Sequence, residues 1–428
     1  MKTLILDGSH ANDMQASIIR RALAVQLPSA ETIVLREQKI GPCAGEFDCW
    51  LRSPGLCHTV DDNRTIAARI MSSDLVVFLT PVTFGGYSSA LKRMVDHHIQ
   101  NISPFFADIQ GETHHRKRYS RYPDMLLIGW MDEPNARAGA IFHHLAIRNA
   151  INMYSAASVC GVVVGMPSGD KLIRQTALWL QAIADRSAAS ASLLAPAEIS
   201  PADAAPARRA VLVVGSPRGE KSTSYATGRY LFEQLEARGC ETRTIQIHAS
   251  IHSKERMRAI LDSIDDADLA VLAFPLYIDS LPAPVIASLE QIAAHRKGRS
   301  SGGRFAAFVN SGFPEPSQND VALAICSEFA HQSGFAWMGG LALGGGEGLV
   351  HGIPLGELGG RGARLRKSLA LAAEALAQGH PVPLCAQALL SKQVIPGWLY
   401  RFIGGIGWKQ RAKRFGMARH LDQQPYLQ

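Results

Sequence analysis

Short apolar runs alternate along the whole chain with longer segments in which apolar residues recur every three or four positions. The short runs have the length of buried strands, and the longer segments have the period of helices that cover one face of a sheet. In the first half, strands are expected over 2–6, 32–35, 74–79, 125–129 and 158–164, and helices over 14–26, 62–72, 88–98, 138–153 and 171–188. Strands that alternate with helices predict an α/β fold with a parallel sheet wrapped on both faces.

The same series begins again after a segment rich in Ala, Pro and Ser. Strands in the second half are expected over 210–214, 242–247, 268–274, 305–310 and 336–343. The two halves align at their landmarks, because Gly8-Ser9 matches Gly215-Ser216 and Asp74 matches Asp268. An internal duplication with an offset of about 205 residues is the simplest explanation.

We therefore predict two tandem flavodoxin-like, doubly wound sheets of five parallel strands each, followed by a basic and aromatic helical tail. In this fold, ligands bind beyond the carboxyl ends of the strands, where strands one and three part. The predicted parts are a first domain over 1–190, a linker over 191–208, a second domain over 209–384 and a tail over 385–428.

The composition is typical of a soluble protein in a reducing compartment. Hydrophobic residues make up 47% of the 428 residues, without an apolar run of about 18 residues that could span a membrane and without a secretory leader. The seven cysteines are odd in number and unevenly spread, which does not suit a disulfide framework. We expect a cytoplasmic protein with no transmembrane segment.

The net charge of +7 is concentrated in the tail, where seven Lys/Arg and no Asp/Glu lie between Cys385 and Leu421. The remainder is close to neutral, which argues against nucleic-acid binding. The basic and apolar tail would suit a membrane-surface helix, but Gly404, Gly405 and Gly407 are expected to interrupt it. Packing against the other domain or a second copy is the favoured interpretation, and a homodimer is expected.

A candidate anion site lies in the stretch from Ala210 to Ser224, which combines a strand, a Gly/Ser turn and a helix start. Unpaired N–H groups and the positive end of the helix dipole face such a turn. The turn has neither the GxxxxGK[ST] nor the GxGxxG pattern, and its hydroxyls suit a phosphate monoester. An ordinary βα turn with a good helix cap is the alternative. The candidate phosphate ligands are Ser216, Arg218, Ser222, Thr223 and Ser224.

The corresponding turn of the first half, residues 8–17, is degenerate. It has no arginine and no cluster of hydroxyls, and Asp13 would repel a phosphate. The first domain is therefore expected to be empty, weakly occupied or adapted to another ligand, and the second domain is expected to hold the phosphate.

Both halves resemble the NAD(P)H-dependent FMN reductase family, and the resemblance spans nearly the whole chain. The turn over 215–224 resembles the FMN-phosphate loop of that family, and 310–315 resembles the loop after strand four. The ring loop of the family is similar to 80–89 in the first half and to 275–282 in the second. The resemblance implies FMN as cofactor and NAD(P)H as reductant.

The residues expected to border the flavin ring follow from these loops. An isoalloxazine ring needs an apolar or aromatic wall and backbone donors, so Tyr277 can form the wall and the glycines let the backbone approach closely. Packing in the core is the alternative for Tyr277 and Phe84. The ring candidates are Pro275, Leu276, Tyr277, Ile278, Asp279, Ser311, Gly312 and Phe313, with Ser9, Pro81, Val82, Thr83, Phe84, Gly85 and Gly86 as further cofactor-binding candidates in the first half.

Three cysteines near the front, Cys43, Cys49 and Cys57, resemble a segment that carries four cysteines in iron–sulfur flavoproteins. Glu46 stands where one of those cysteines would be. Because cluster ligation normally needs four thiolates, no metal site is predicted. Reduced thiols in a folded loop are favoured, and a redox-active Cys43–Cys49 pair is the alternative.

Two other segments each have two possible interpretations. The basic and aromatic insertion over 111–119 could hold a pyridine-nucleotide phosphate or an acidic partner, but a solvated face is favoured. The glycine-rich segment over 339–348 follows the last strand of the second domain, and it is either a close approach to the flavin or a plain loop.

These features predict an FMN-dependent oxidoreductase that takes hydride from NAD(P)H and reduces a quinone, a nitro or azo compound, or free flavin. No catalytic side chain is assigned, because the flavin carries the chemistry. The alternatives are an electron-transfer flavoprotein that serves a protein partner, and a cofactor-free binding module.

Overall fold

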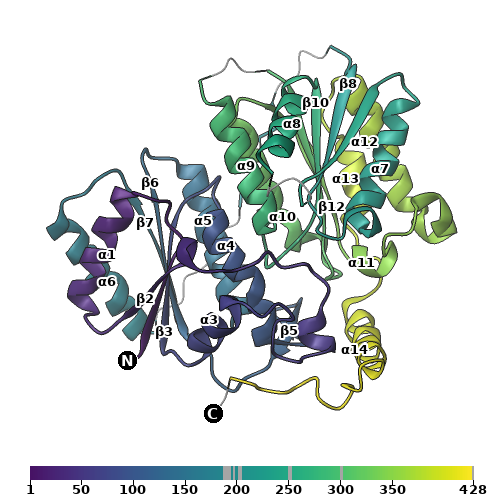
Figure 1. The fold of residues 1–428 in the computed structure, drawn as a ribbon. Helices are drawn as coiled ribbons and strands as arrows, with labels where there is room; N and C mark the ends of the chain where they lie inside the picture. Colours follow the sequence, from purple (N-terminus) through teal and green to yellow (C-terminus); the bar gives the residue numbers. More distant parts are fainter. Residues whose placement is uncertain (187–193, 196–197, 201–204, 249–252, 299–301, 427–428) are drawn as a thin grey trace. The chain divides into compact units, whose positions relative to one another are not determined.

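The computed structural model describes residues 1–186, 194–195, 198–200, 205–248, 253–298 and 302–426 (Figure 1). The chain divides into two compact units. Unit 1 comprises Met1–Leu194 together with Arg401–Gln428, and unit 2 comprises Ala195–Tyr400. Half of the predicted linker over 191–208 lies outside the described residues.

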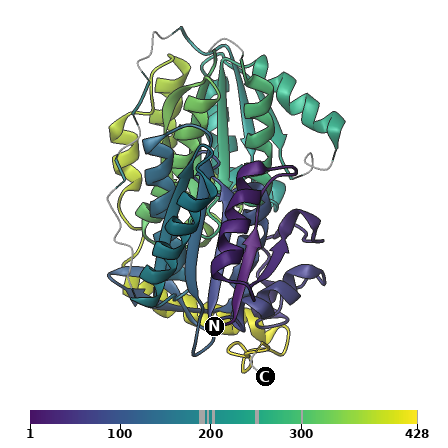
Figure 2. The same cartoon turned by 90° about the vertical axis from the view of Figure 1, so that its left-hand side faces the viewer.

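Unit 1 contains a five-stranded parallel sheet with the order β2-β1-β3-β6-β7. Its strands are β1 (Thr3–Asp7), β2 (Glu31–Val34), β3 (Leu75–Pro81), β6 (Asp124–Met131) and β7 (Ser158–Val164). Helices α1 (Met14–Gln26) and α6 (Gly169–Ala184) cover one face, as Figure 2 shows, and α3 (Asp62–Met71), α4 (Ser89–Asp96) and α5 (Ala136–Asn152) cover the other. The core of the first face is built from apolar residues of β1, β3 and β6 and the inner sides of α1 and α6.

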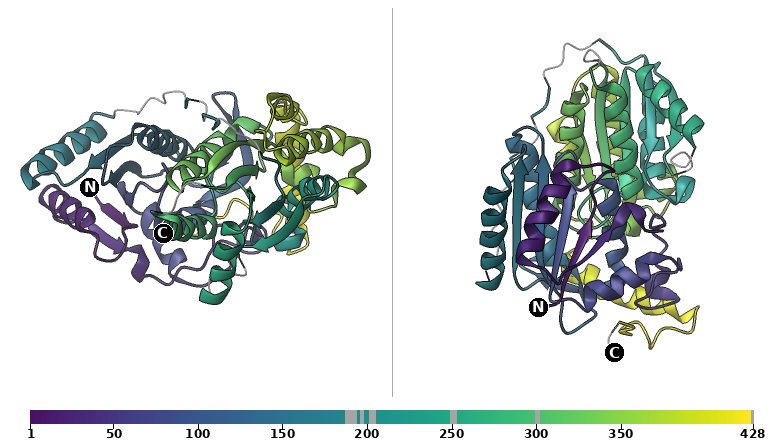
Figure 3. Two further views of the ribbon diagram at one scale, coloured as in Figure 1. Left: turned by 90° about the horizontal axis from the view of Figure 1, so that it is seen from above. Right: turned by 60° about the vertical axis from the view of Figure 1, so that its left-hand side comes forward.

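Unit 2 repeats this plan with the strand order β9-β8-β10-β11-β12. Its strands are β8 (Arg209–Val214), β9 (Glu241–Gln246), β10 (Leu269–Pro275), β11 (Arg304–Asn310) and β12 (Ala336–Leu343). Helices α7 (Thr223–Glu236), α12 (Ala363–Ala377) and α13 (Leu384–Leu390) lie on one face, and α8 (Lys254–Asp265), α9 (Ala283–Arg296) and α10 (Asp320–Gln332) on the other (Figure 3). The predicted fold class, two flavodoxin-like sheets in tandem, is confirmed.

The turns after the first strand of each sheet have the same hydrogen bond and the same close packing. Gly8 N donates to Leu79 O, and Gly215 N donates to Ala273 O, both at 2.8 Å. A Cβ at Gly8 would lie 2.6 Å from Leu91 Cβ, and one at Gly215 would lie 2.6 Å from Val285 Cγ2. Only glycine fits at either position, because the helix after the third strand packs directly on the turn.

Unit 1 also contains an antiparallel hairpin that the sequence pattern did not predict. It consists of β4 (Ile102–Ile109) and β5 (Glu112–Lys117) and lies between α4 and β6 in the chain. The remaining short elements are α2 (Asp48–Leu51), α11 (Gly346–Leu349), η1 (Leu35–Glu37), η2 (His97–Asn101), η3 (Gly219–Lys221), η4 (Pro316–Asn319) and η5 (Leu355–Gly362).

The favoured interpretation of the insertion over 111–119 as a solvated face is wrong for its central residues. His114, Arg118 and Tyr119 are buried. The Arg118 guanidinium donates to the carbonyl oxygens of Leu421 at 2.9 Å and Gln423 at 2.7 Å. Its charge is therefore used inside unit 1, where it holds the end of the chain.

The expectation that glycines interrupt the tail helix is also wrong, since α14 runs unbroken over Gly397–Lys413. Gly404 lies against the ring of Phe106, where a Cβ would overlap the ring. The close approach of the two segments thus accounts for this glycine. None of the described helices is both long enough and apolar enough to cross a bilayer.

Candidate functional site

The turn after β8 in unit 2 gathers four buried hydroxyl side chains, those of Ser216, Ser222, Thr223 and Ser224. Ser222 is the N-cap of α7, where its Oγ accepts a hydrogen bond from Tyr225 N at 3.0 Å. The same hydroxyl donates to Gly219 O at 2.6 Å. This cap satisfies one N–H of the first helical turn and leaves the others directed at the turn, as in an anion site.

The other hydroxyls tie the turn to neighbouring loops. Ser224 Oγ accepts from the side chain of Asn310, at the end of β11, at 2.8 Å. Thr223 Oγ1 donates to Gly346 O at 3.5 Å. The turn is therefore held by the carboxyl end of the sheet and by the segment after β12, and its hydroxyls already have defined positions.

Arg218, the one charged residue among the predicted phosphate ligands, forms an ion pair with Glu347. Its Nη1 lies 2.8 Å from both carboxylate oxygens of Glu347, and His351 Nδ1 lies 3.0 Å from one of them. Glu347 was not among the predicted site residues, although it is the single acidic residue of the glycine-rich segment over 339–348. Its carboxylate offsets the positive charge that a phosphate would meet.

The ring loops of the two units have the same backbone geometry. In unit 2, Tyr277 and Ser280 exchange backbone hydrogen bonds of 2.9 and 3.1 Å. The two residues between them, Ile278 and Asp279, have φ of 43° and 57°. A β-branched residue with positive φ is a strained exception, and such strain is concentrated at functional sites.

In unit 1, the same pair of bonds joins Thr83 and Gly86 at 2.9 and 2.7 Å. Phe84 and Gly85 between them have φ of 52° and 82°. Phe84 is buried, whereas Ile278 at the matching position of the second loop is half-buried, as is Tyr277 before it. The wall that a flat ring could use is thus more open in unit 2.

A third loop, Ser311–Phe313, lies between the ring loop and the glycine-rich segment of unit 2. Leu276 N donates to Asn310 O at 2.8 Å, and Gly346 N donates to Ser311 O at 2.9 Å. The hydroxyl of Tyr400 donates to Gly312 O. Burial raises the pKa of Tyr400, and the carboxylates of Glu315 and Glu347 raise that pKa further. Tyr400 lies in the predicted tail, and no residue pattern around it indicates a position at this edge.

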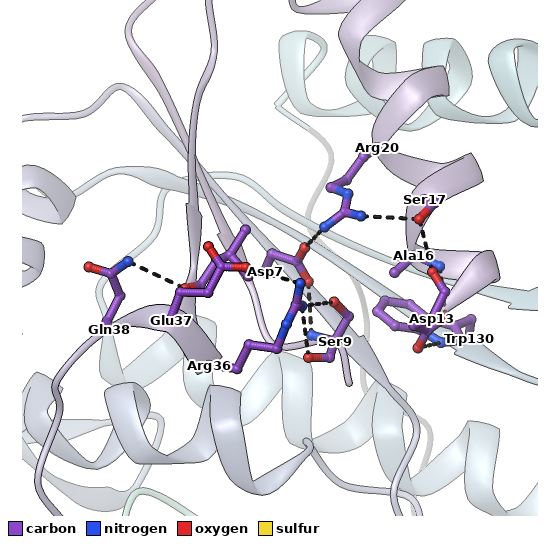
Figure 4. Close-up of polar contacts among 11 residues, drawn as sticks. Asp7, Ser9, Asp13, Ala16, Ser17, Arg20, Arg36, Glu37, Gln38 and Trp130 are labelled. Atoms are coloured by element: carbon purple, nitrogen blue, oxygen red, sulfur yellow. Dashed lines mark hydrogen bonds and ion pairs between the residues drawn. The ribbon is translucent and has the colours of Figure 1, made fainter. Parts of the chain in front are cut away.

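In the turn of unit 1, the polar side chains are already bonded to neighbouring groups (Figure 4). Asp13 caps α1 by accepting from Ala16 N at 2.9 Å, and its second oxygen accepts from Trp130 Nε1 at 3.1 Å. The end of the helix that would attract a phosphate therefore already holds a carboxylate. Asp7, buried at the end of β1, accepts from Ser9 N at 2.8 Å.

Two arginines reach the unit 1 turn from outside it, which the sequence of the turn alone could not show (Figure 4). Arg20 of α1 forms an ion pair with Asp7. Arg36, after β2, donates to Ser9 Oγ at 2.9 Å and lies 3.2 Å from Glu37. Each arginine is paired with an acid, so the turn gains no strong excess of positive charge.

Cys43, Cys49 and Cys57 line one small pocket of unit 1 together with His97 and Gln100. His97 Nε2 donates to Gly41 O at 2.8 Å, and in the neutral ring Nδ1 is then the acceptor that faces Cys57 Sγ at 3.5 Å. Burial lowers the pKa of His97, but its contacts with Cys57 and Gly41 outweigh burial, so that pKa lies above its usual value.

The thiols themselves are poor candidates for chemistry. Burial raises the pKa of Cys43, with a further increase from Asp96, and it raises the pKa of Cys49 well above its usual value. Such thiols stay protonated and are weak nucleophiles. Across the described part of the chain, no three His, Cys, Asp or Glu side chains are arranged to hold a metal ion.

The comparisons with known proteins agree with this architecture. The sequence model of a family described as NADPH-dependent FMN reductase matches residues 1–118 and 208–324. An iron–sulfur flavoprotein of Methanocaldococcus jannaschii is 29% identical over 100 residues, which are 22% of this chain and 51% of that protein. The match thus spans about half the length of this relative.

Two solved structures each match about two fifths of this chain. An FMN-dependent NADH-azoreductase from Bacillus anthracis, in complex with FMN, is 14% identical and covers 40% of this chain and 99% of its own, with a TM-score of 0.31. An NAD(P)H:quinone oxidoreductase from Methanothermobacter marburgensis is 14% identical. The match covers 41% of this chain and 96% of that protein, with a TM-score of 0.30.

The M. jannaschii relative is described as an iron–sulfur flavoprotein, but the cysteine pocket of this chain does not fit an iron–sulfur cluster. A cluster is normally held by four thiolates, but three thiols line this pocket. No step of the chemistry is therefore assigned to such a group.

Proposed function

The chain belongs to the NADPH-dependent FMN reductase family, and on this premise we propose that it is an oxidoreductase that binds FMN in unit 2. It takes hydride from NAD(P)H and passes electrons to a small-molecule acceptor, namely a quinone, a nitro or azo compound, or free flavin. The observation that carries this proposal is the meeting of the phosphate turn, the ring loop and Ser311–Phe313 at one edge of the unit 2 sheet.

Each loop has a separate task in this proposal. The phosphate of FMN is held by the first turn of α7, by the hydroxyls of Ser216, Ser222, Thr223 and Ser224, and by Arg218. Pro275–Asp279 borders the ring, with the half-buried Tyr277 as its wall. Ser311, Gly312 and Phe313 border the ring from the next strand. FMN supplies the redox chemistry when bound, and the protein's residues bind and orient it.

Unit 1 has a different role in this proposal. Its ring loop has the geometry of the unit 2 loop, so Pro81–Gly86 can border a flat ligand. Its turn holds the Asp13 carboxylate where a phosphate would bind. We therefore propose that unit 1 does not hold FMN by its phosphate. The homodimer and the cytoplasmic location stay predictions, which light scattering and cell fractionation would test.

The proposal is tested by comparing FMN with riboflavin, which lacks the phosphate. Replacing Arg218 and Ser222 by Ala removes two groups that would bind a charged ligand, each worth about 1.5–3 kcal/mol. FMN affinity should fall by at least about 100-fold, while riboflavin affinity should change by less than about threefold. Arg229→Ala on the exposed side of α7 is the matched control, because its side chain pairs with Glu236 away from the turn.

Equal losses of FMN and riboflavin affinity in the double variant would contradict the phosphate role. Binding of neither flavin by the unaltered protein would contradict the proposed function altogether. NAD(P)H oxidation by the flavin-loaded protein, followed with each acceptor class in turn, then identifies the acceptor.

A further inference from the structure

Helix α14 has an inner face that packs on unit 1. Trp408 contacts Phe47 and Trp50, with ring centroids 5.3 and 5.1 Å apart. Gly404 lies against the ring of Phe106, and Ala412 is fully buried. These three helix residues are spaced by four positions, so they form one stripe along the helix. This stripe fixes which side of α14 faces outward.

The outward side of α14 is apolar. Trp398 and Phe402 are each 66% exposed, Ile403 is 51% exposed and Ile406 is 44% exposed. Trp398, Phe402 and Ile406 are again spaced by four positions, on the side opposite the inner stripe. Single exposed apolar residues are common on soluble proteins, but a contiguous row of large ones marks an interaction site. We call these four residues the outer face of α14.

The charge around the outer face selects its partner. Lys409 and Lys413 continue the line of the apolar row, and Arg414 follows the helix; all three are exposed. No acidic residue lies between Cys385 and Leu421. A parallel two-fold contact with a second copy would bring these like charges together, and an antiparallel one would leave them without an acidic partner on the facing helix. A surface with negative charges beside an apolar layer would match both the apolar outer face and the basic residues next to it.

We propose that the outer face of α14 binds the surface of a bilayer that contains anionic lipids. The helix lies in the plane of the interface, with Trp398, Phe402, Ile403 and Ile406 in the boundary between headgroups and acyl chains. Lys409, Lys413 and Arg414 lie at the lipid phosphates. The helix does not cross the bilayer, in agreement with its length and its hydropathy. Binding of α14 to a bilayer would not require a bound flavin.

The test is co-sedimentation of the full chain with vesicles of phosphatidylcholine alone and of phosphatidylcholine with phosphatidylglycerol. We expect sedimentation with the anionic vesicles, little with the neutral ones, and a steep loss as the salt concentration rises. Phe402→Ser with Ile406→Ser should lower partitioning by about tenfold or more, since two exposed apolar side chains are lost. Lys413→Gln with Arg414→Gln should lower it by about tenfold.

The matched controls lie on α6, another exposed helix of unit 1. Leu178 is 64% exposed, so Leu178→Ser removes a comparable apolar side chain, and Lys171→Gln removes an exposed charge. Both should partition like the unaltered protein. Because every substituted residue is exposed, thermal unfolding midpoints should agree among all variants.

Three outcomes overturn the proposal. The first is absence of sedimentation with anionic vesicles, and the second is an equal loss in the Leu178→Ser control. The third is conversion of a dimer to a monomer by Phe402→Ser with Ile406→Ser, measured by light scattering, while vesicle binding is unchanged. The last result would assign the outer face to a contact between copies of the chain.

Discussion

Arg218 and Glu347 form a two-oxygen ion pair at 2.8 Å, at the turn where unit 2 would receive a phosphate. The two residues are 129 positions apart in the sequence. Glu347 is brought to the turn by the segment after β12, which is also bonded to Thr223 and Ser311. A phosphate that binds here must therefore compete with a carboxylate of the same chain.

Glu347→Gln should tighten FMN binding, because it removes a like charge and releases Arg218 for the phosphate. Both side chains are about 30% exposed, so solvent screens the pair and we expect a threefold to tenfold lower Kd for FMN. Riboflavin binding should not change. Glu357→Gln, at an exposed position of the same unit, is the control, and fluorescence titration with both flavins is the measurement. Weaker FMN binding would mean that Glu347 positions Arg218 instead of competing for it.

Gly8→Ala and Gly215→Ala should each destabilise their own unit by about 1–3 kcal/mol, since the new Cβ lies within 2.6 Å of a packed helix. Gly139→Ala in α5 is the control, because a Cβ there meets nothing within 4 Å. Thermal unfolding followed by circular dichroism should show a lower midpoint for the first two variants only. Unchanged midpoints would indicate that the helices after β3 and β10 can move away.

Asp13→Ala should cost unit 1 about 1 kcal/mol, because it removes the cap of α1. Asp13→Ser keeps a capping oxygen, so it should cost only a few tenths. Urea unfolding would rank the two variants. Equal losses would assign the stabilising role of Asp13 to its bond with Trp130.

Cys43 and Cys49 should react slowly with iodoacetamide at pH 8, because burial raises the pKa of both thiols. Cys385 is exposed and should be labelled first, as mass spectrometry of the labelled peptides would show. The raised pKa values also determine in which direction stability changes with pH. The unfolded chain loses these protons near a pKa of about 8.5, so the free energy of unfolding should fall as the pH rises through and above that value.

Rapid labelling of Cys43 at neutral pH would contradict the protonated thiol and would revive the alternative of a redox-active Cys43–Cys49 pair.

The sequence was sufficient for the features that depend on local pattern. Both sheets could be predicted because their strands are short apolar runs between helices. The turn at Ser216 and the ring loops could be located because glycine, proline and hydroxyl residues follow a predicted strand in each half.

The features that the sequence did not reveal depend on contacts between distant segments. Strand β5 reads Glu-Thr-His-His-Arg-Lys, which has no strand pattern, and it pairs with β4 through contacts such as that between His115 and Phe106. Glu347 and Tyr400 reach the phosphate and ring loops only through the folded chain. Gly404 looks like a helix breaker until its neighbour Phe106 is known.

The most direct test of the central claim is the amount of flavin bound per chain, measured from the visible spectrum of the reconstituted protein and the identity of the released cofactor. We expect one FMN per chain, which is lost when Arg218 and Ser222 are replaced by Ala. Two FMN per chain would contradict the role given to Asp13 in unit 1, and no bound FMN would contradict the assignment of the flavin site to unit 2.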